Sequence, residues 1–297
     1  MSQARFRSLD GIDMVIEYDT FGDPADPALL LIMGYTAQMV QWEEGWCRML
    51  ADRGLFVIRF DNRDCGLSTK LDGVTVDVDA VIKAALLEEP VPSVPYTLRE
   101  MAADAVSLLD HLGIDRAHLV GASMGGMIAQ QMAISYPERT ASLTSIMSQP
   151  GDPSVGQPTP EAAAALIAPA PTEREAYLDH SATWLIWQSR AHRSEARTRL
   201  NAARDFDRSC YPEGGPRQLA AIYASGSRES GLAALKTPTL VIHGLDDTLI
   251  SPSGGERTAA LVPGATLLLV DDMGHDLPEP LWPMLVDAIA EHARSAA

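Results

Sequence analysis

Residues 117–126 read AHLVGASMGG, and this stretch decides the fold. Its apolar start, residues 117–120, predicts a buried strand, and residues 124–135 have the apolar spacing of a helix. The order G-x-S-x-G places Ser123 on a sharp turn between them, where only small neighbours fit. A helix that begins at Met124 aims free backbone N–H groups at an anion formed beside the serine. Ser123 is therefore a candidate nucleophile; the alternative is a glycine-rich turn without chemistry.

The same alternation of strands and helices continues on both sides of this stretch. Apolar or alternating runs predict further strands at residues 14–20, 28–33, 55–60, 239–243 and 265–270. Amphipathic spacing predicts helices at residues 98–112 and 284–293. We therefore expect an α/β fold with a mostly parallel central sheet flanked by helices.

The middle of the chain interrupts this pattern. Prolines punctuate its start, and residues 173–190 and 194–207 then look helical. The strand pattern resumes afterwards, so the interruption reads as one insertion. We expect a core formed by residues 1–148 and 232–297, with a helical cap at residues 149–231.

Composition narrows the function. The 297 residues include 40 Asp and Glu against 23 Lys and Arg, a formal charge of −17 that repels nucleic acids and anionic membranes. Three cysteines without C-x-x-C spacing predict neither a disulfide framework nor a metal site, and favour the cytoplasm. No nucleotide-binding fingerprint follows a strand, so no cofactor is expected. A homo-oligomer is neither indicated nor excluded.

A serine nucleophile needs a base, and the base needs a carboxylate to orient it. His275 lies between the last predicted strand and the last helix, at the edge where parallel strands end, and is the expected base. Asp247 follows strand 239–243 and is the expected acid. Asp246 competes with it, because spacing alone does not decide which of two adjacent turn residues faces inward.

A second oxyanion donor is expected on the loop after strand 28–33. A backbone N–H at the end of a strand can point at a developing oxyanion, and here the residue is Tyr35. The N–H groups of Tyr35 and Met124 form the expected pair. The alternative is a tight turn with no such role.

Together these features resemble the α/β-hydrolase superfamily over most of the core, through residues 21–31, 61–69, 121–125, 244–247 and 274–275. Within it, the likeness is greatest to the aclacinomycin methylesterases. This resemblance implies a serine carboxylic-ester hydrolase with a helical cap. By position, its nucleophile, acid and base fall on Ser123, Asp247 and His275, and its oxyanion donors on Tyr35 and Met124.

Two departures from the family concern the loop after strand 28–33. Many relatives have His-Gly where this chain has Met33 and Gly34, which leaves the backbone donor intact but changes what supports the loop. Tyr35 stands where the methylesterases have glycine, so we expect the pocket beside the oxyanion hole to be narrower or differently lined. The cap shows little likeness, and the anthracycline substrate is therefore not expected to transfer.

We predict a serine carboxylic-ester hydrolase for a small to medium hydrophobic ester, such as the methyl ester of a polyketide, acting through an acyl-enzyme. Serine at position 123 argues against epoxide hydrolases and haloalkane dehalogenases, which use aspartate there. Lactonase, thioesterase or cofactor-free perhydrolase activity would use the same triad. A ligand receptor built on this fold is a further alternative.

Two cap tryptophans are candidates for substrate binding. Trp184 and Trp187 are three residues apart and share one helical face. Such a face either lines the substrate pocket or packs the cap on the core. We predict that both tryptophans line the substrate pocket, with packing of the cap on the core as the alternative.

Overall fold

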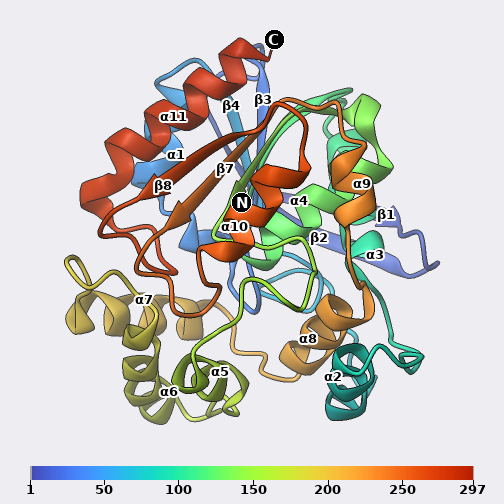
Figure 1. Cartoon of the computed structure of the whole chain (residues 1–297), viewed down its shortest axis with the longest axis vertical. Helices are drawn as coiled ribbons and strands as arrows, with labels where there is room; N and C mark the ends of the chain where they lie inside the picture. The colour runs from blue at the N-terminus through green and yellow to red at the C-terminus, as the bar shows by residue number, and fades with distance from the viewer. Residues whose placement is uncertain (1, 297) are drawn as a thin grey trace.

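An eight-stranded sheet lies at the centre of the computed structural model, which describes residues 2–296 (Figure 1). The strand order is β1-β2-β4-β3-β5-β6-β7-β8. β2 runs antiparallel to β1 and β4, and all other neighbours are parallel. The predicted mostly parallel sheet is confirmed. The strands are β1 Ser2–Arg7, β2 Asp13–Phe21, β3 Ala28–Ile32, β4 Phe56–Phe60, β5 Ala117–Ala122, β6 Thr140–Ile146, β7 Thr239–Gly244 and β8 Thr266–Val270.

Helices cover both faces of the sheet because successive strand residues point to opposite faces. In β3, Leu30 and Ile32 join a buried cluster with α3 (Leu98–His111) and α4 (Met124–Ser135), whereas Leu29 and Leu31 join a second cluster with α1 (Glu44–Ala51) and α11 (Trp282–Ser295). The α-helices are α1 Glu44–Ala51, α2 Val78–Leu86, α3 Leu98–His111, α4 Met124–Ser135, α5 Pro160–Ile167, α6 Arg174–His180, α7 Glu195–Arg208, α8 Gly214–Ala224, α9 Glu229–Ala233, α10 Ser253–Leu261 and α11 Trp282–Ser295. The 3-10 helices of the described residues are η1 Met39–Gln41, η2 Pro137–Arg139, η3 Ser181–Ile186 and η4 Glu279–Leu281.

Helices α5 to α9 lie between β6 and β7 in the sequence, where the cap is predicted. In Figure 1, α5, α6 and α7 gather at one end of the molecule, and α8 lies beside α2. Helix α9 spans the predicted boundary at residue 231 and packs against α4 and α10. The insertion does not interrupt the sheet, because β6, which precedes it, pairs directly with β7, which follows it.

Two local predictions differ from the structure. The helix expected at residues 173–190 ends at His180 and continues as the 3-10 helix η3. Here the Ser181 hydroxyl donates to the Leu178 carbonyl at 2.7 Å, and the Thr183 hydroxyl donates to the His180 carbonyl at 2.8 Å, so side chains compete with the regular backbone ladder. Strands β1 and β6 were not predicted.

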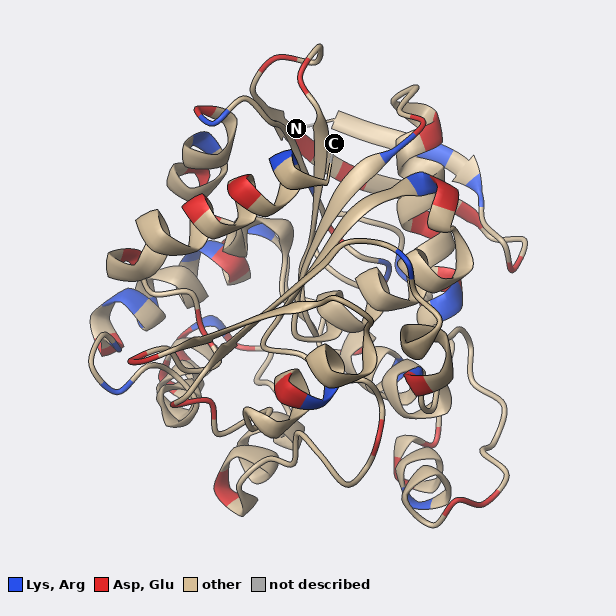
Figure 2. Ribbon diagram, turned by 45° about the horizontal axis from the view of Figure 1, so that its top comes forward, with Lys and Arg blue, Asp and Glu red and all other residues tan. Residues whose placement is uncertain are grey.

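Charge is concentrated away from the middle of the sheet. Strands β3, β5, β6, β7 and β8 contain no Lys, Arg, Asp or Glu, and Figure 2 shows these residues mainly on helices and loops. Strands β3, β5, β6 and β7 are buried along their whole length, where an unpaired charge would be costly, whereas the edge strand β8 is mostly exposed. Within residues 2–296, none of the helices combines the length and the apolar character needed to span a membrane.

Candidate active site

Ser123 occupies the strained turn between β5 and α4. Its backbone φ is 56° and ψ is −123°, a conformation that side-chain-bearing residues rarely adopt, and its side chain is partly exposed. A Cβ atom added at Gly121 would overlap the Gly125 carbonyl, and one added at Gly125 would overlap the Ile32 carbonyl. The turn can form only because both positions lack side chains. The Ser123 N–H donates to the Ile146 carbonyl of β6 at 3.0 Å.

The structure brings Asp247 and His275 together. The Nδ1 atom of His275 lies 2.7 Å from Oδ2 of Asp247, which is 4% exposed. The other carboxylate oxygen of Asp247 accepts from the N–H groups of Leu249 and Ile250, each at 2.9 Å. Burial works to raise the pKa of Asp247, but the charge of His275 and hydrogen bonds from His243 and His275 lower it below its usual value. This carboxylate is held in its charged form.

Asp246, the competing acid, turns toward the insertion instead. Its Oδ2 accepts from the Arg190 N–H at 3.2 Å, and its Oδ1 lies 3.7 Å from the Arg190 guanidinium. The side chain is partly exposed, in contrast to that of Asp247. The two neighbours on this turn therefore face different elements.

His243 is a second histidine on the Asp247 carboxylate that the sequence analysis did not assign. Its side chain is fully buried, and Nε2 lies 2.8 Å from the Ile250 carbonyl and 3.4 Å from Oδ2 of Asp247. Because a carbonyl can only accept, Nε2 carries the hydrogen and helps to orient the carboxylate. The four-residue spacing between His243, near the end of β7, and Asp247 was the available signal.

The loop at residues 33–36, which we call the oxyanion loop, lies against Ser123. A Cβ atom added at Gly34 would stand 3.0 Å from Cβ and 3.5 Å from Oγ of Ser123. Within residues 2–296, the N–H groups of Tyr35 and Met124 have no hydrogen-bond acceptor. Burial of the Tyr35 ring raises the pKa of its phenol to about 12, so the phenol stays neutral. Both predicted donors are thus unpaired; Met124 directly follows the serine, and Tyr35 follows Gly34, which lies against it.

A segment of the insertion, residues 186–190, crosses the loops that carry Asp247 and His275, and we call it the cap strap. The His275 N–H donates to the Trp187 carbonyl at 2.6 Å, and the Ser189 N–H donates to the Asp276 carboxylate at 2.9 Å. Burial raises the pKa of Asp276. Sequence reasoning did not identify Asp276, which follows the expected base directly.

The two candidate tryptophans differ in their surroundings. The ring of Trp184 packs edge-on against Tyr177, with centroids 5.7 Å apart, and against His180 at 6.3 Å. Trp187 instead lies on the cap strap, where its backbone contacts His275. Both side chains are partly buried. Of the two, only Trp187 is brought next to the candidate site by a direct contact.

Comparisons with known proteins agree with this architecture. A family profile described as "alpha/beta hydrolase fold" matches residues 27–279. Rhodomycin D methylesterase DauP of Streptomyces sp. strain C5 is 30% identical over 302 residues, covering 93% of each chain. The 3-oxoadipate enol-lactonase 2 of Acinetobacter baylyi is 30% identical over 132 residues, 44% of this chain and 41% of the relative. A thermophilic esterase from Thermogutta terrifontis, solved with malate bound, superposes with a TM-score of 0.74 at 22% identity, over 100% of this chain and 99% of that chain.

The near full-length likeness to a methylesterase identifies the protein as an enzyme of the carboxylic-ester hydrolase class. The esterase structure, at its low identity, supports the shared fold alone. Because the family profile spans most of the sequence, from just before β3 to the start of η4, the chain belongs to the α/β-hydrolase fold family.

Proposed function

We propose that Ser123, His275 and Asp247 form a catalytic triad that hydrolyses a carboxylic ester through an acyl-enzyme. The observation that carries this proposal is the 2.7 Å contact between His275 Nδ1 and the buried Asp247 carboxylate. Ser123 follows β5, Asp247 follows β7 and His275 follows β8, so all three belong to the carboxyl edge of the parallel sheet. The order serine, acid, histidine along the chain is that of α/β hydrolases.

The chemistry assigns each residue one task. Asp247 accepts the Nδ1–H of His275, which leaves Nε2 as the base that takes the Ser123 proton. The Ser123 oxygen forms a bond to the ester carbonyl carbon, and the oxyanion accepts from the N–H groups of Tyr35 and Met124. When the intermediate collapses, the bond to the alcohol oxygen breaks and His275 returns the proton to that oxygen. Water then repeats the cycle on the acyl-enzyme and releases the acid.

The substrate we propose is a small to medium hydrophobic ester, with the methyl ester of a polyketide as the leading example. The name of the near full-length relative, rhodomycin D methylesterase, supports this class. We assign the cap to residues 149–231. Of the two candidate tryptophans, we propose substrate contacts for Trp187, which lies beside His275, and for Trp184 the alternative role of packing within the cap, against Tyr177 and His180. The free cysteines Cys47, Cys65 and Cys210 are consistent with a cytoplasmic enzyme.

A lactone is the second candidate substrate. The relative named 3-oxoadipate enol-lactonase 2 matches 44% of the chain, and an enol-lactone is a cyclic ester that the same triad can open. In a lactone the acyl part and the alcohol part belong to the same molecule. The alcohol part therefore stays attached to the acyl-enzyme and does not leave the site at the acylation step.

A matched panel tests both candidates. Methyl esters of graded acyl size and lactones of graded ring size are assayed with the wild-type enzyme and with Ser123→Ala. A fluorophosphonate probe, which labels activated serines, is applied to the same samples. We expect turnover and labelling in the wild type, and neither in the variant. Ester turnover that survives in Ser123→Ala contradicts the triad, and labelling without turnover of any substrate favours a receptor.

A further inference from the structure

We infer that Gln218 of helix α8 is a positioning residue for the oxyanion loop, so that the insertion completes the oxyanion hole rather than merely covering it. This inference rests on the proposed function, because it concerns the N–H of Tyr35. Gln218 does not touch the reacting atoms itself. It acts by holding the peptide that follows Tyr35.

The contacts of Gln218 use both ends of its amide. Its Oε1 accepts from the Thr36 N–H at 2.8 Å, and its Nε2 donates to the Arg63 carbonyl at 2.8 Å. The side chain is fully buried. The Thr36 nitrogen and the Tyr35 carbonyl belong to one planar peptide group, so the contact restricts rotation next to the Tyr35 N–H. An amide is suited to this place, because it offers one acceptor and one donor without burying charge.

The oxyanion loop needs such anchors. Thr36 has a φ of 54°, in the left-handed region that residues with side chains rarely occupy, so its surroundings must hold it there. Two anchors come from the loop after β4: the Cys65 thiol donates to the Thr36 carbonyl at 3.3 Å, and the Asn62 amide donates to the Met33 carbonyl at 2.8 Å. Gln218 is the anchor that comes from the insertion.

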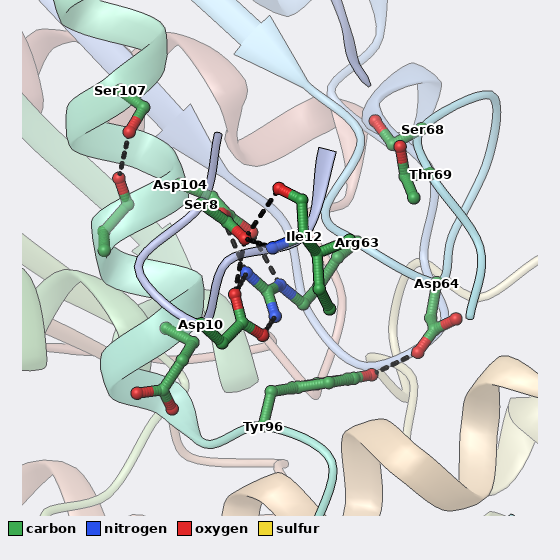
Figure 3. Close-up of polar contacts among 12 residues, drawn as sticks. Ser8, Asp10, Ile12, Arg63, Asp64, Ser68, Thr69, Tyr96, Asp104 and Ser107 are labelled. Carbon is green, nitrogen blue, oxygen red and sulfur yellow. Dashed lines mark hydrogen bonds and ion pairs between the residues drawn. The ribbon is translucent and has the colours of Figure 1, made fainter. Parts of the chain in front are cut away.

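The partner of Gln218 is itself immobilised. The guanidinium of Arg63 is fully buried and binds Asp104 through two hydrogen bonds, at 2.6 and 2.8 Å, and Asp10 at 2.8 Å (Figure 3). Paired, bidentate contacts of this kind fix both the position and the plane of the guanidinium. The backbone of Arg63 is therefore held in place, and the Gln218 amide donates its hydrogen bond to a fixed carbonyl.

Helix α8 is also attached one residue before Gln218. Arg217 donates to both carboxylate oxygens of Asp64, each at 2.8 Å. The hydroxyl of Tyr96 donates to the same carboxylate at 2.7 Å, as Figure 3 shows. The side chains of Arg217, Asp64 and Tyr96 are all buried. This contact fixes the rotation and height of α8 relative to the loop after β4.

The first turn of α8 packs closely against the loop after β4 and against the oxyanion loop. A Cβ atom added at Gly214 would overlap the Asp64 carbonyl. One added at Gly215 would stand 3.0 Å from the hydroxyl of Tyr35. The helix can thus approach closely enough for Gln218 to reach Thr36.

Two substitutions separate positioning from packing. Gln218→Met keeps the approximate shape but removes both hydrogen bonds, whereas Gln218→Glu keeps the acceptor for Thr36 at the cost of burying a carboxyl group. We expect kcat per titrated serine to fall about 10- to 100-fold in Gln218→Met, less than the loss of about 10²- to 10³-fold for deleting a donor outright. Gln218→Glu should retain more activity than Gln218→Met although it melts at the same or a lower temperature.

The matched control is Gln130→Met. Gln130 is a fully buried glutamine in α4 whose amide donates to the Ser145 hydroxyl at 3.1 Å and accepts from Arg228 at 3.0 Å, away from the oxyanion loop. We expect this variant to lose melting temperature but little kcat. The affinity for a boronic acid, which forms a tetrahedral adduct with serine, should fall in Gln218→Met and not in Gln130→Met, with KM changed less than about threefold in both.

The outcomes are distinguishable from those of the triad proposal. If Ser123→Ala abolishes activity and yet Gln218→Met keeps its kcat, or loses no more than Gln130→Met, the triad stands and the role of Gln218 is wrong. The same conclusion follows if Gln218→Glu is less active than Gln218→Met.

Hydrogen exchange in the wild-type enzyme gives a test that needs no variant. The Thr36 amide should be protected and the Tyr35 amide should exchange readily, and an unprotected Thr36 amide overturns the inference.

Discussion

The backbone N–H of His275 donates to the backbone carbonyl of Trp187 across 2.6 Å, so the cap strap and the loop of the proposed base form one hydrogen-bonded unit. The Thr248 hydroxyl donates to the Ile186 carbonyl at 3.0 Å, one turn residue after the proposed acid. A displacement of the cap strap would therefore shift both the loop that carries Asp247 and the loop that carries His275. Changes in the insertion should alter turnover as well as substrate choice.

Replacement of the proposed nucleophile is the first prediction. Ser123→Ala should lower kcat by about 10⁴-fold or more, because no other group forms the acyl-enzyme. The change removes one partly exposed hydroxyl, so the melting temperature should stay close to that of the wild type. Steady-state kinetics and a thermal melt on the same preparation check both statements. A variant that keeps most of its activity moves the nucleophile elsewhere.

The two adjacent carboxylates give the second prediction. Asp247→Asn should lower kcat by about 10⁴-fold, since the imidazolium loses its counter-charge and the wrong tautomer of His275 is favoured. Asp246→Asn should change stability by no more than about 0.5 kcal/mol, because Asp246 is partly exposed and pairs with the exposed Arg190. The two kcat values decide which carboxylate is the triad acid, and we expect Asp247→Asn to lose far more kcat than Asp246→Asn. A larger loss in Asp246→Asn reverses it.

The third prediction contrasts Trp184 with Trp187. Trp184→Ala should mainly destabilise the fold, by about 2 kcal/mol or more, because its ring packs on Tyr177 and His180. Trp187→Ala should change the ranking of esters by acyl or alcohol size more than it changes the melting temperature, since Trp187 lies on the cap strap beside His275. The ester panel and a thermal melt are read together. An unchanged ranking in Trp187→Ala removes this residue from the substrate site.

The fourth prediction concerns pH and the buried Asp205 of α7. Burial raises its pKa to about 6, although Arg204, Gln41 and Arg208 work to lower it. The folded state therefore binds a proton that the unfolded state releases near pH 4. The stabilising effect of that proton is complete below about pH 4 and is lost as the pH rises through about 6, with an upper limit of about 3 kcal/mol.

Asp205→Asn should remove this dependence. The melting temperature of the variant, measured relative to that of the wild type, should rise between pH 4 and pH 7. Asp207→Asn on the same helix is the control, because Asp207 is exposed and its pKa is lowered by the contact with Arg174. A difference between Asp205→Asn and wild type that stays constant with pH contradicts the prediction.

The strands with continuous apolar runs could be predicted from the sequence, and β6 could not. Its residues TASLTSI are all buried, yet their polar side chains read as those of a surface segment. Two of its polar groups find distant partners in the folded chain: Ser142 lies 2.9 Å from Nδ1 of His118, and Ser145 accepts from Gln130 at 3.1 Å. Burial lowers the pKa of His118 to about 4, which fits a structural role for this histidine.

The candidate site also contains residues that could be predicted from the sequence and one that could not. Ser123, Asp247 and His275 could be proposed because each follows a predicted strand, and parallel strands end at one edge of a sheet. Gln218 gave no such signal, because a glutamine in an amphipathic helix reads as a surface residue. Its partner Thr36 is 182 positions away in the sequence. Only the docking of α8 reveals the contact.

The insertion between β6 and β7 also fixes the order in which the enzyme is completed during synthesis. Leu143 of β6 pairs with Thr239 of β7, so the nascent sheet keeps an open edge at β6 until the ribosome has finished the whole insertion. Unpaired strand edges of this kind recruit other chains. Ser123 emerges long before Asp247 and His275, and the proposed triad is assembled only by the last strands. The nascent chain therefore exposes this strand edge at a stage when the residues of the proposed triad are not yet together.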